Sequence, residues 1–163
     1  MTGTLYADAE AFGAALPPGR ALCGLDLGTK TIGVAVSDTS CRIASPLRTI
    51  KRSRFAADAA LLLALFTERA IGGVVIGLPR NMDGSEGPRA QSARAFARNL
   101  TALAPLPTTF WDERLSTVAA ERALLEADTS RRRRAEVIDH VAAGYILQGL
   151  LDRLAHAERQ APR

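Results

Sequence analysis

The stretch ALCGLDLGTKTIGVAVS, residues 21–37, decides the fold of this 163-residue chain. Residues 21–27 are apolar except for one aspartate, and they predict a buried strand. A Gly-Thr-Lys turn signal at 28–30 is followed by the apolar stretch 31–37, which predicts a second strand paired with the first as a hairpin. Asp26 is the exception inside the first strand, because a buried carboxylate is costly unless a metal ion, a hydrogen-bond donor or solvent meets it.

The rest of the chain predicts alternating strands and helices. The expected strands cover 42–50, 74–78 and 107–112, and the expected helices cover 55–69, 88–103, 116–126 and 131–154. This order predicts an α/β fold with a mixed five-stranded sheet, three antiparallel strands followed by parallel strands, flanked by helices. We expect residues 1–20 to be a variable lead-in, 21–155 to be the folded domain and 156–163 to be a charged tail.

Composition narrows the class of protein. Apolar residues make up 47% and charged residues 23% of the chain, an ordinary globular balance. No apolar run is long enough to cross a bilayer, and no basic-then-apolar segment opens the chain, which favours a cytoplasmic protein without a membrane partner. The two cysteines lack zinc-binding spacing. The net charge of +4 is carried almost entirely by arginine, whose planar fork suits phosphate.

Three further acidic residues, in two segments of the chain, accompany Asp26. The triplet Asp112-Glu113-Arg114 follows the last predicted strand, and parallel strands that end in one direction bring their terminal loops together. Asp139 lies in the last predicted helix, where helical spacing places it on one face with Ala142, Ala143 and Ile146. Small alanines would let this helix lie close to the sheet and bring Asp139 near Asp26.

Each acidic position also has a structural explanation. Asp26 could cap the turn that follows it, the triplet could form an Asp–Arg pair in solvent, and Asp139 could be an exposed charge.

Basic and polar side chains are expected around these acids. Lys30, Arg80, Asn81 and Arg114 fall on predicted loops at one sheet end, where they could contact phosphates. The last helix begins with Arg131, Arg132, Arg133 and Arg134, although cations at a helix start oppose its dipole, which suggests a phosphate partner. A solvated surface is the alternative for each. Aromatic residues are few, which favours shape and backbone recognition of a structured nucleic acid.

Four blocks of sequence, taken in order, resemble the YqgF family of pre-16S ribosomal RNA nucleases and Holliday junction resolvase-like proteins. The blocks are GLDLGTKTIGVAVSD (24–38), IGLPRNMDGSEGPRAQ (76–91), DERLST (112–117) and IDHVAAGYIL (138–147). The resemblance covers residues 21–152 and implies a ribonuclease H-like fold. It also implies an acidic triad of Asp26, Glu113 and Asp139 that binds Mg²⁺ or Mn²⁺, with Asp112 as an auxiliary ligand.

The implied activity is metal-dependent hydrolysis of phosphodiester bonds at the 5′ end of pre-16S ribosomal RNA. The implied partners are structured nucleic acid, with RNA favoured over DNA, and ribosomal precursor particles, bound by a monomer or a homodimer. Members of the family commonly carry a basic residue after the last aspartate or further upstream in the same helix. In this sequence His140 and the arginines at 131–134 occupy those regions, which is a departure from the family pattern. The sequence departs from RuvC resolvases at Leu78-Pro79, because no acid ends that strand and Glu113 must supply the second carboxylate.

Three other functions remain open on the sequence. A Holliday junction resolvase would need a symmetric dimer, because two cuts are made across one junction. An ATP-binding fold of the actin and sugar-kinase type shares the Asp-Leu-Gly-Thr stretch at 26–29, but this chain is short for two such lobes. A non-catalytic RNA-binding module is disfavoured, because carboxylates repel phosphates.

Overall fold

The structure is a computed structural model that describes residues 2–115 and 131–160, with the backbone alone described for 131–139. Its sheet has six strands in the order β1-β6-β5-β2-β3-β4. The strands are β1 (Leu5–Tyr6), β2 (Ala21–Leu27), β3 (Thr31–Ser37), β4 (Ala44–Lys51), β5 (Ile71–Leu78) and β6 (Thr108–Asp112). The helices are α1 (Ala9–Ala15), α2 (Phe55–Glu68), α3 (Pro88–Leu103) and α5 (Arg131–Gln160), with a 3₁₀ turn η1 (Glu113–Leu115).

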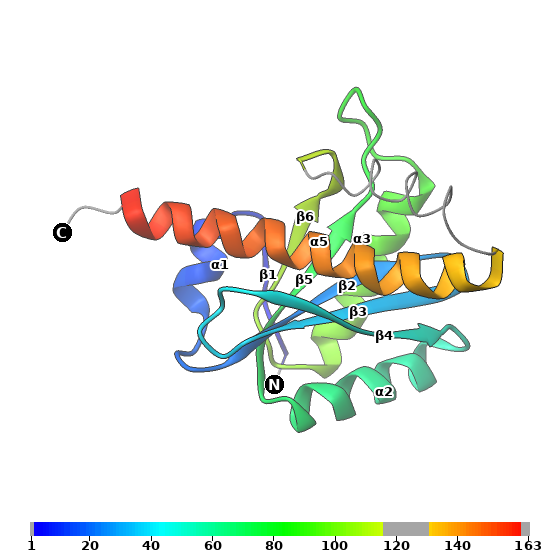
Figure 1. Ribbon diagram of the computed structural model, residues 1–163, viewed down its shortest axis with the longest axis horizontal. Helices are drawn as coiled ribbons and strands as arrows, with labels where there is room; N and C mark the ends of the chain where they lie inside the picture. Colours follow the sequence, from blue (N-terminus) through cyan, green and yellow to red (C-terminus); the bar gives the residue numbers. More distant parts are fainter. Residues whose placement is uncertain (1, 116–130, 161–163) are drawn as a thin grey trace.

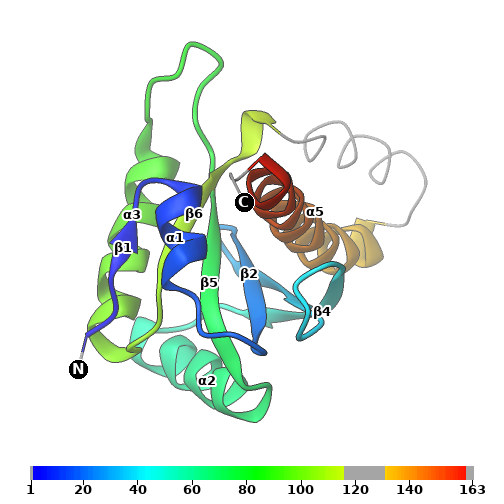
Figure 2. The ribbon, with the colours of Figure 1, turned by 90° about the vertical axis from the view of Figure 1, so that its left-hand side faces the viewer.

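Strand pairing confirms the predicted mixed sheet. β3 pairs antiparallel with both β2 and β4, whereas β5 pairs parallel with β2 and β6. Helices α1 and α5 cover one face of this sheet, and α2 and α3 cover the other (Figures 1 and 2). β2 and β5 lie at the centre and are buried on both faces, which is why they read as continuous apolar runs.

Close packing of α5 depends on a glycine in the central strand. A Cβ atom at Gly24 would lie 2.7 Å from the Leu147 Cβ and 3.0 Å from the Ala143 carbonyl oxygen. A side chain at position 24 would therefore force the helix away from the sheet. Ala142 and Ala143 are themselves buried, as the predicted alanine face requires.

The lead-in and the tail contain structure that the sequence analysis did not predict. β1 lies within residues 1–20 and adds a sixth strand by pairing parallel with β6, and the Phe12 side chain of α1 is fully buried. Helix α5 continues to Gln160, and it packs on α1 at Leu154, where a Cβ at Gly13 would lie 2.9 Å from Leu154 Cδ2. Arg153 also pairs with Glu10. The helix expected at 116–126 lies outside the described residues.

The edge strand β4 is irregular. Pro46 stands opposite Ala35, and the register of the β3–β4 pair shifts between Val34 and Ala35. The Pro46 ring packs beneath α5, 3.2 Å from the position that a Gly144 Cβ would take. Within the described ranges, no helix combines the length and the apolarity needed to cross a bilayer.

Candidate active site

The site is built around Asp26, whose side chain is only 2% exposed. In the sheet Asp26 pairs with Gly33 of β3, which in turn pairs with Thr49 of β4. On the other side, the pair Leu25–Ile76 places Gly77 of β5 next to Asp26 at the following step of the ladder. Asp26 therefore has a glycine on each neighbouring strand, and neither glycine supplies a side chain to fill the space beside the carboxylate.

Glu113 occupies part of that space. Its Oε1 lies 2.8 Å from the position that a Cβ on Gly77 would take, and Ile146 Cδ1 of α5 lies 2.5 Å from the same point. The Glu113 carboxylate thus lies against the face of β5 that α5 covers, and β5 is the strand next to β2, which carries Asp26. The sequence analysis predicted that these two acids meet but missed Gly77, whose only signal is a glycine within a β-branched strand.

Helix α5 passes over β4 and β2 close to Asp26. His140 Nδ1 is 3.0 Å from Thr49 Oγ1, and the Ala143 carbonyl lies over Gly24. Position 139 comes one helical turn before Ala143. The Asp139 side chain lies outside the described residues, so its meeting with Asp26 and Glu113 remains a prediction. Among the side chains that the structure describes, no three His, Cys, Asp or Glu groups could hold a metal ion.

Asp112 and Arg114 form an ion pair. This pair is the structural explanation that the sequence analysis considered for the Asp112-Glu113-Arg114 triplet. Arg114 Nη2 donates to Asp112 Oδ2 at 2.6 Å, and Arg114 Nε donates to Oδ1 at 3.0 Å. These hydrogen bonds hold the pKa of Asp112 below its usual value. To act as an auxiliary metal ligand, Asp112 would have to give up its hydrogen bonds with Arg114 and bind the metal ion instead.

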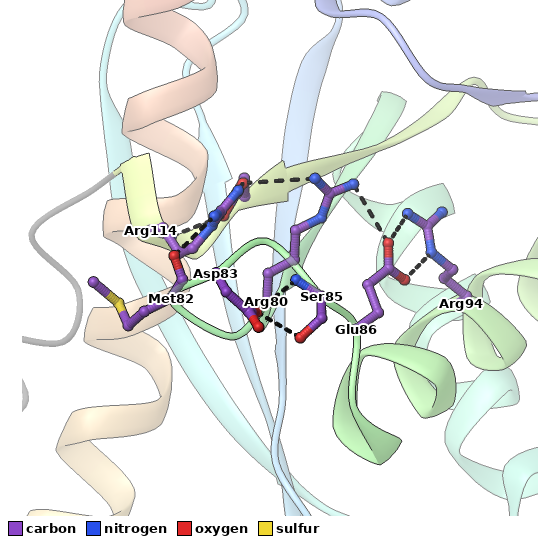
Figure 3. Close-up of polar contacts among 8 residues, drawn as sticks. Arg80, Met82, Asp83, Ser85, Glu86, Arg94 and Arg114 are labelled. Carbon is purple, nitrogen blue, oxygen red and sulfur yellow. Dashed lines mark hydrogen bonds and ion pairs between the residues drawn. The ribbon is translucent and has the colours of Figure 1, made fainter.

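The charge network continues into the loop between β5 and α3 (Figure 3). Arg80 lies between two carboxylates, 3.9 Å from Asp112 Oδ2 and 3.4 Å from Glu86 Oε2. Arg94 of α3 donates to both oxygens of Glu86, at 2.5 and 2.8 Å, and lowers the pKa of Glu86. The network ties the loop to the end of β6 and to α3, and it neutralises part of the charge of Arg80 and Arg114.

The remaining predicted contact residues are more exposed. Lys30 lies at the tip of the β2–β3 turn, and Asn81 donates from Nδ2 to Ser85 Oγ at 3.0 Å within the loop. The backbone of Arg131, Arg132, Arg133 and Arg134 forms the first turn of α5, and their side chains lie outside the described residues. Lys30, Asn81, Arg80 and Arg114 all follow strands that end at the Asp26 edge of the sheet, as the topology predicted.

We expect Asp112→Asn to lower the free energy of unfolding by about 1 kcal/mol at neutral pH, because Arg114 loses its charged partner. The folded-state pKa of Asp112 is depressed, so its contribution is present above the ordinary carboxyl pKa and is lost as the pH falls through the lower folded value. Urea unfolding should therefore give a lower free energy of unfolding for Asp112→Asn than for the wild type at pH 7. In acid the two values should become nearly equal. The control is Glu68→Gln, an exposed carboxyl at the end of α2; equal losses in both variants would contradict the assignment.

The fold identifies the structural class. The structure superposes on RuvC of Thermus thermophilus, solved in complex with a Holliday junction substrate, with a TM-score of 0.51 at 14% identity over 83% of this chain and 96% of that one. That likeness shows the ribonuclease H-like fold, here with six strands rather than the predicted five.

The family follows from closer relatives. The model of the RuvX family, described as Holliday junction resolvase, matches residues 20–153. A Cereibacter sphaeroides protein is 71% identical over 92% of this chain and 94% of its own length, and a Rhodobacter capsulatus protein is 73% identical over 91% and 93%; both bear the name "Putative pre-16S rRNA nuclease". The chain belongs to the RuvX (YqgF) family and is a nuclease, a hydrolase of phosphodiester bonds. The resemblance seen in the sequence is confirmed.

Proposed function

We propose that this chain is a divalent-metal-dependent nuclease that processes the 5′ end of pre-16S ribosomal RNA in the cytoplasm. The observation that carries the proposal is the pair of carboxylates at the centre of the sheet, Asp26 buried on β2 and Glu113 seated over Gly77 of the next strand. A purely structural acid has no need of a second carboxylate beside it, since two like charges in a buried site repel each other. Residues 21–155 would form the nuclease domain.

The donor set fits Mg²⁺ or Mn²⁺, which are hard ions that prefer carboxylate oxygens. Asp26, Glu113 and Asp139 would hold the metal, and Gly33 and Gly77 on the neighbouring strands place no side chain beside the Asp26 carboxylate. A metal ion bound there supplies the activation of a water molecule and the stabilisation of the leaving oxygen.

Side chains of this chain would position the substrate. Lys30, Arg80, Asn81 and Arg114 lie on loops at the same sheet edge as Asp26 and can contact backbone phosphates on either side of the cut. Arg131, Arg132, Arg133 and Arg134 would extend this contact along the start of α5. The partner we propose is a structured RNA within a ribosomal precursor particle, and the names of the relatives support RNA over DNA.

Resolution of Holliday junctions is the second candidate, because the family description and the RuvC fold favour it. It would require a homodimer that presents two sites to one junction.

One experiment separates the two candidates. The purified chain is incubated with precursor 16S RNA that carries its 5′ leader, and separately with a four-way DNA junction, each with Mg²⁺, with Mn²⁺ or with EDTA. We expect metal-dependent cleavage of the RNA at its mature 5′ end, and accumulation of unprocessed 5′ ends in cells depleted of the protein. Cleavage of the junction alone would favour the resolvase, and cleavage that persists in EDTA would contradict the metal-dependent mechanism.

A further inference from the structure

A small pocket lies at the end of β2, on the opposite side of this strand from the Asp26 carboxylate. It is lined by the β2–β3 turn, the chain after β4 and the first turns of α3, through Leu27, Gly28, Thr29, Arg52, Arg89, Ser92 and Ala93. Leu27 packs in the core that α2 and α3 cover, so the pocket is on the opposite face of the sheet from α5. Gly28 follows Asp26 by two residues, about 7 Å of extended chain.

The pocket is basic and holds no acid among its described lining residues. Arg52 donates from Nη1 to the Gly28 carbonyl oxygen at 2.6 Å, and its guanidinium lies 5.6 Å from the centre of the Phe96 ring. Arg89 is exposed on the first turn of α3. Within the described part of the chain, neither arginine forms an ion pair with a carboxylate.

This sets the pocket apart from the neighbouring loop. Arg80, Arg94 and Arg114 are each paired with Asp112 or Glu86, so much of their charge is already neutralised. The two pocket arginines keep their charge available. Arg52 is also held in place by Gly28 and Phe96, so it would lose less side-chain freedom on binding than a free arginine would.

We propose that this pocket binds a backbone phosphate of the nucleic acid strand, close to the phosphate that is cut. The Arg52 and Arg89 guanidinium groups donate to the phosphate oxygens, and the hydroxyl groups of Thr29 and Ser92 complete the site. A phosphate held beside Gly28 fixes the register of the strand relative to Asp26, which decides which bond is cut. The inference rests on the proposed nuclease function, and it adds a contact that the predicted loop residues do not include.

Arg89→Gln tests the pocket, with Arg98→Gln as the matched control. Arg98 is exposed on the same helix nine residues later, about two and a half turns away and so on the opposite side. The probes are a labelled RNA hairpin and a DNA hairpin of the same sequence, titrated in EDTA over a range of salt concentrations. We expect Arg89→Gln to bind about tenfold more weakly at low salt and to reduce the slope of log K against log salt by about one.

The control and the wild type decide between the possible failures. Arg98→Gln should bind like the wild type. A loss confined to one hairpin supports the pocket and names the strand chemistry that it binds. If the wild type binds but Arg89→Gln has the same slope, or if both variants lose affinity equally, the pocket is overturned while the nuclease function stands. If the wild type binds neither hairpin and cuts no substrate, the proposed function is overturned, and the pocket with it.

A second variant checks the geometry of the contact. Arg52→Lys keeps the charge but loses the planar fork, so affinity should fall while the salt slope stays near that of the wild type. Unchanged affinity would remove Arg52 from the site.

Discussion

We expect Asp26→Asn to abolish metal-dependent cleavage and to leave a folded protein that binds nucleic acid as tightly as the wild type or more tightly. Asparagine is nearly isosteric, so packing beside the glycines at 33 and 77 survives. The exchange removes an anionic ligand from the proposed metal site and lessens repulsion of the phosphate backbone. We expect the cleavage rate to fall by at least about a thousandfold, which corresponds to about 4 kcal/mol of transition-state stabilisation.

Asp58→Asn is the matched control for this variant. Asp58 is also 2% exposed, but it lies on α2 on the opposite face, where Oδ1 accepts a hydrogen bond from the Ser53 amide at 3.1 Å. Cleavage rates, thermal unfolding and hairpin binding should be measured for both variants. Asp58→Asn should cost some stability and keep the cleavage rate. A wild-type rate for Asp26→Asn would remove Asp26 from the metal site, and failure of Asp26→Asn to fold would identify Asp26 as a structural cap.

Gly77→Ala should lower cleavage by about a hundredfold, because a displacement of the catalytic geometry by about 1 Å has an effect of this size. The added methyl group would lie 2.8 Å from Glu113 Oε1 and 2.5 Å from Ile146 Cδ1, so these two side chains must shift, and we expect the shift to displace the Glu113 carboxylate from its position over β5. Overpacking should also reduce stability by about 1–3 kcal/mol.

Gly73→Ala separates the lost activity from the lost stability. It lies on the same face of the same strand, about 13 Å from Gly77, and its Cβ would lie 2.4 Å from Leu16 Cδ2 and 3.0 Å from Phe12 Cζ. We expect a similar loss of stability and nearly normal cleavage when both variants are assayed well below their unfolding temperatures. Equal loss of cleavage in the two variants would show that Gly77 acts only through packing.

The central part of this fold could be predicted because its residues carry local signals. The apolar run at 21–27, the turn at 28–30 and the run at 31–37 predict the hairpin from local signals alone, and the structure contains it. β1 could not be found in this way, since a two-residue strand has no periodicity and forms only because β6 offers it an edge. Likewise β5 begins at Ile71, three residues earlier than predicted. The sequence analysis missed these residues because two glycines interrupt the β-branched pattern there.

The sequence named the candidate acids, whose catalytic role remains a prediction, but it did not indicate the glycines beside them. In the triplet at 112–114, Asp112 and Arg114 form the ion pair considered as its structural explanation, while the Glu113 carboxylate lies against Gly77 and its metal-binding role remains a prediction. Helical spacing places position 139 on the face of Ala143, but sequence alone could not show that Gly77 leaves room for Glu113. The Arg52 contact with Gly28 joins residues from separate elements, so it too depends on tertiary structure.

Both borders of the sheet resist the addition of another strand. On one side β1 offers only two residues, and on the other β4 contains Pro46, which has no backbone N–H and lies at an irregular register. These features disfavour the joining of two copies of this chain into one continuous sheet. We expect a homodimer able to cut two strands of a junction to meet through helices or loops, and chemical crosslinking should be directed first at those surfaces rather than at β1 or β4.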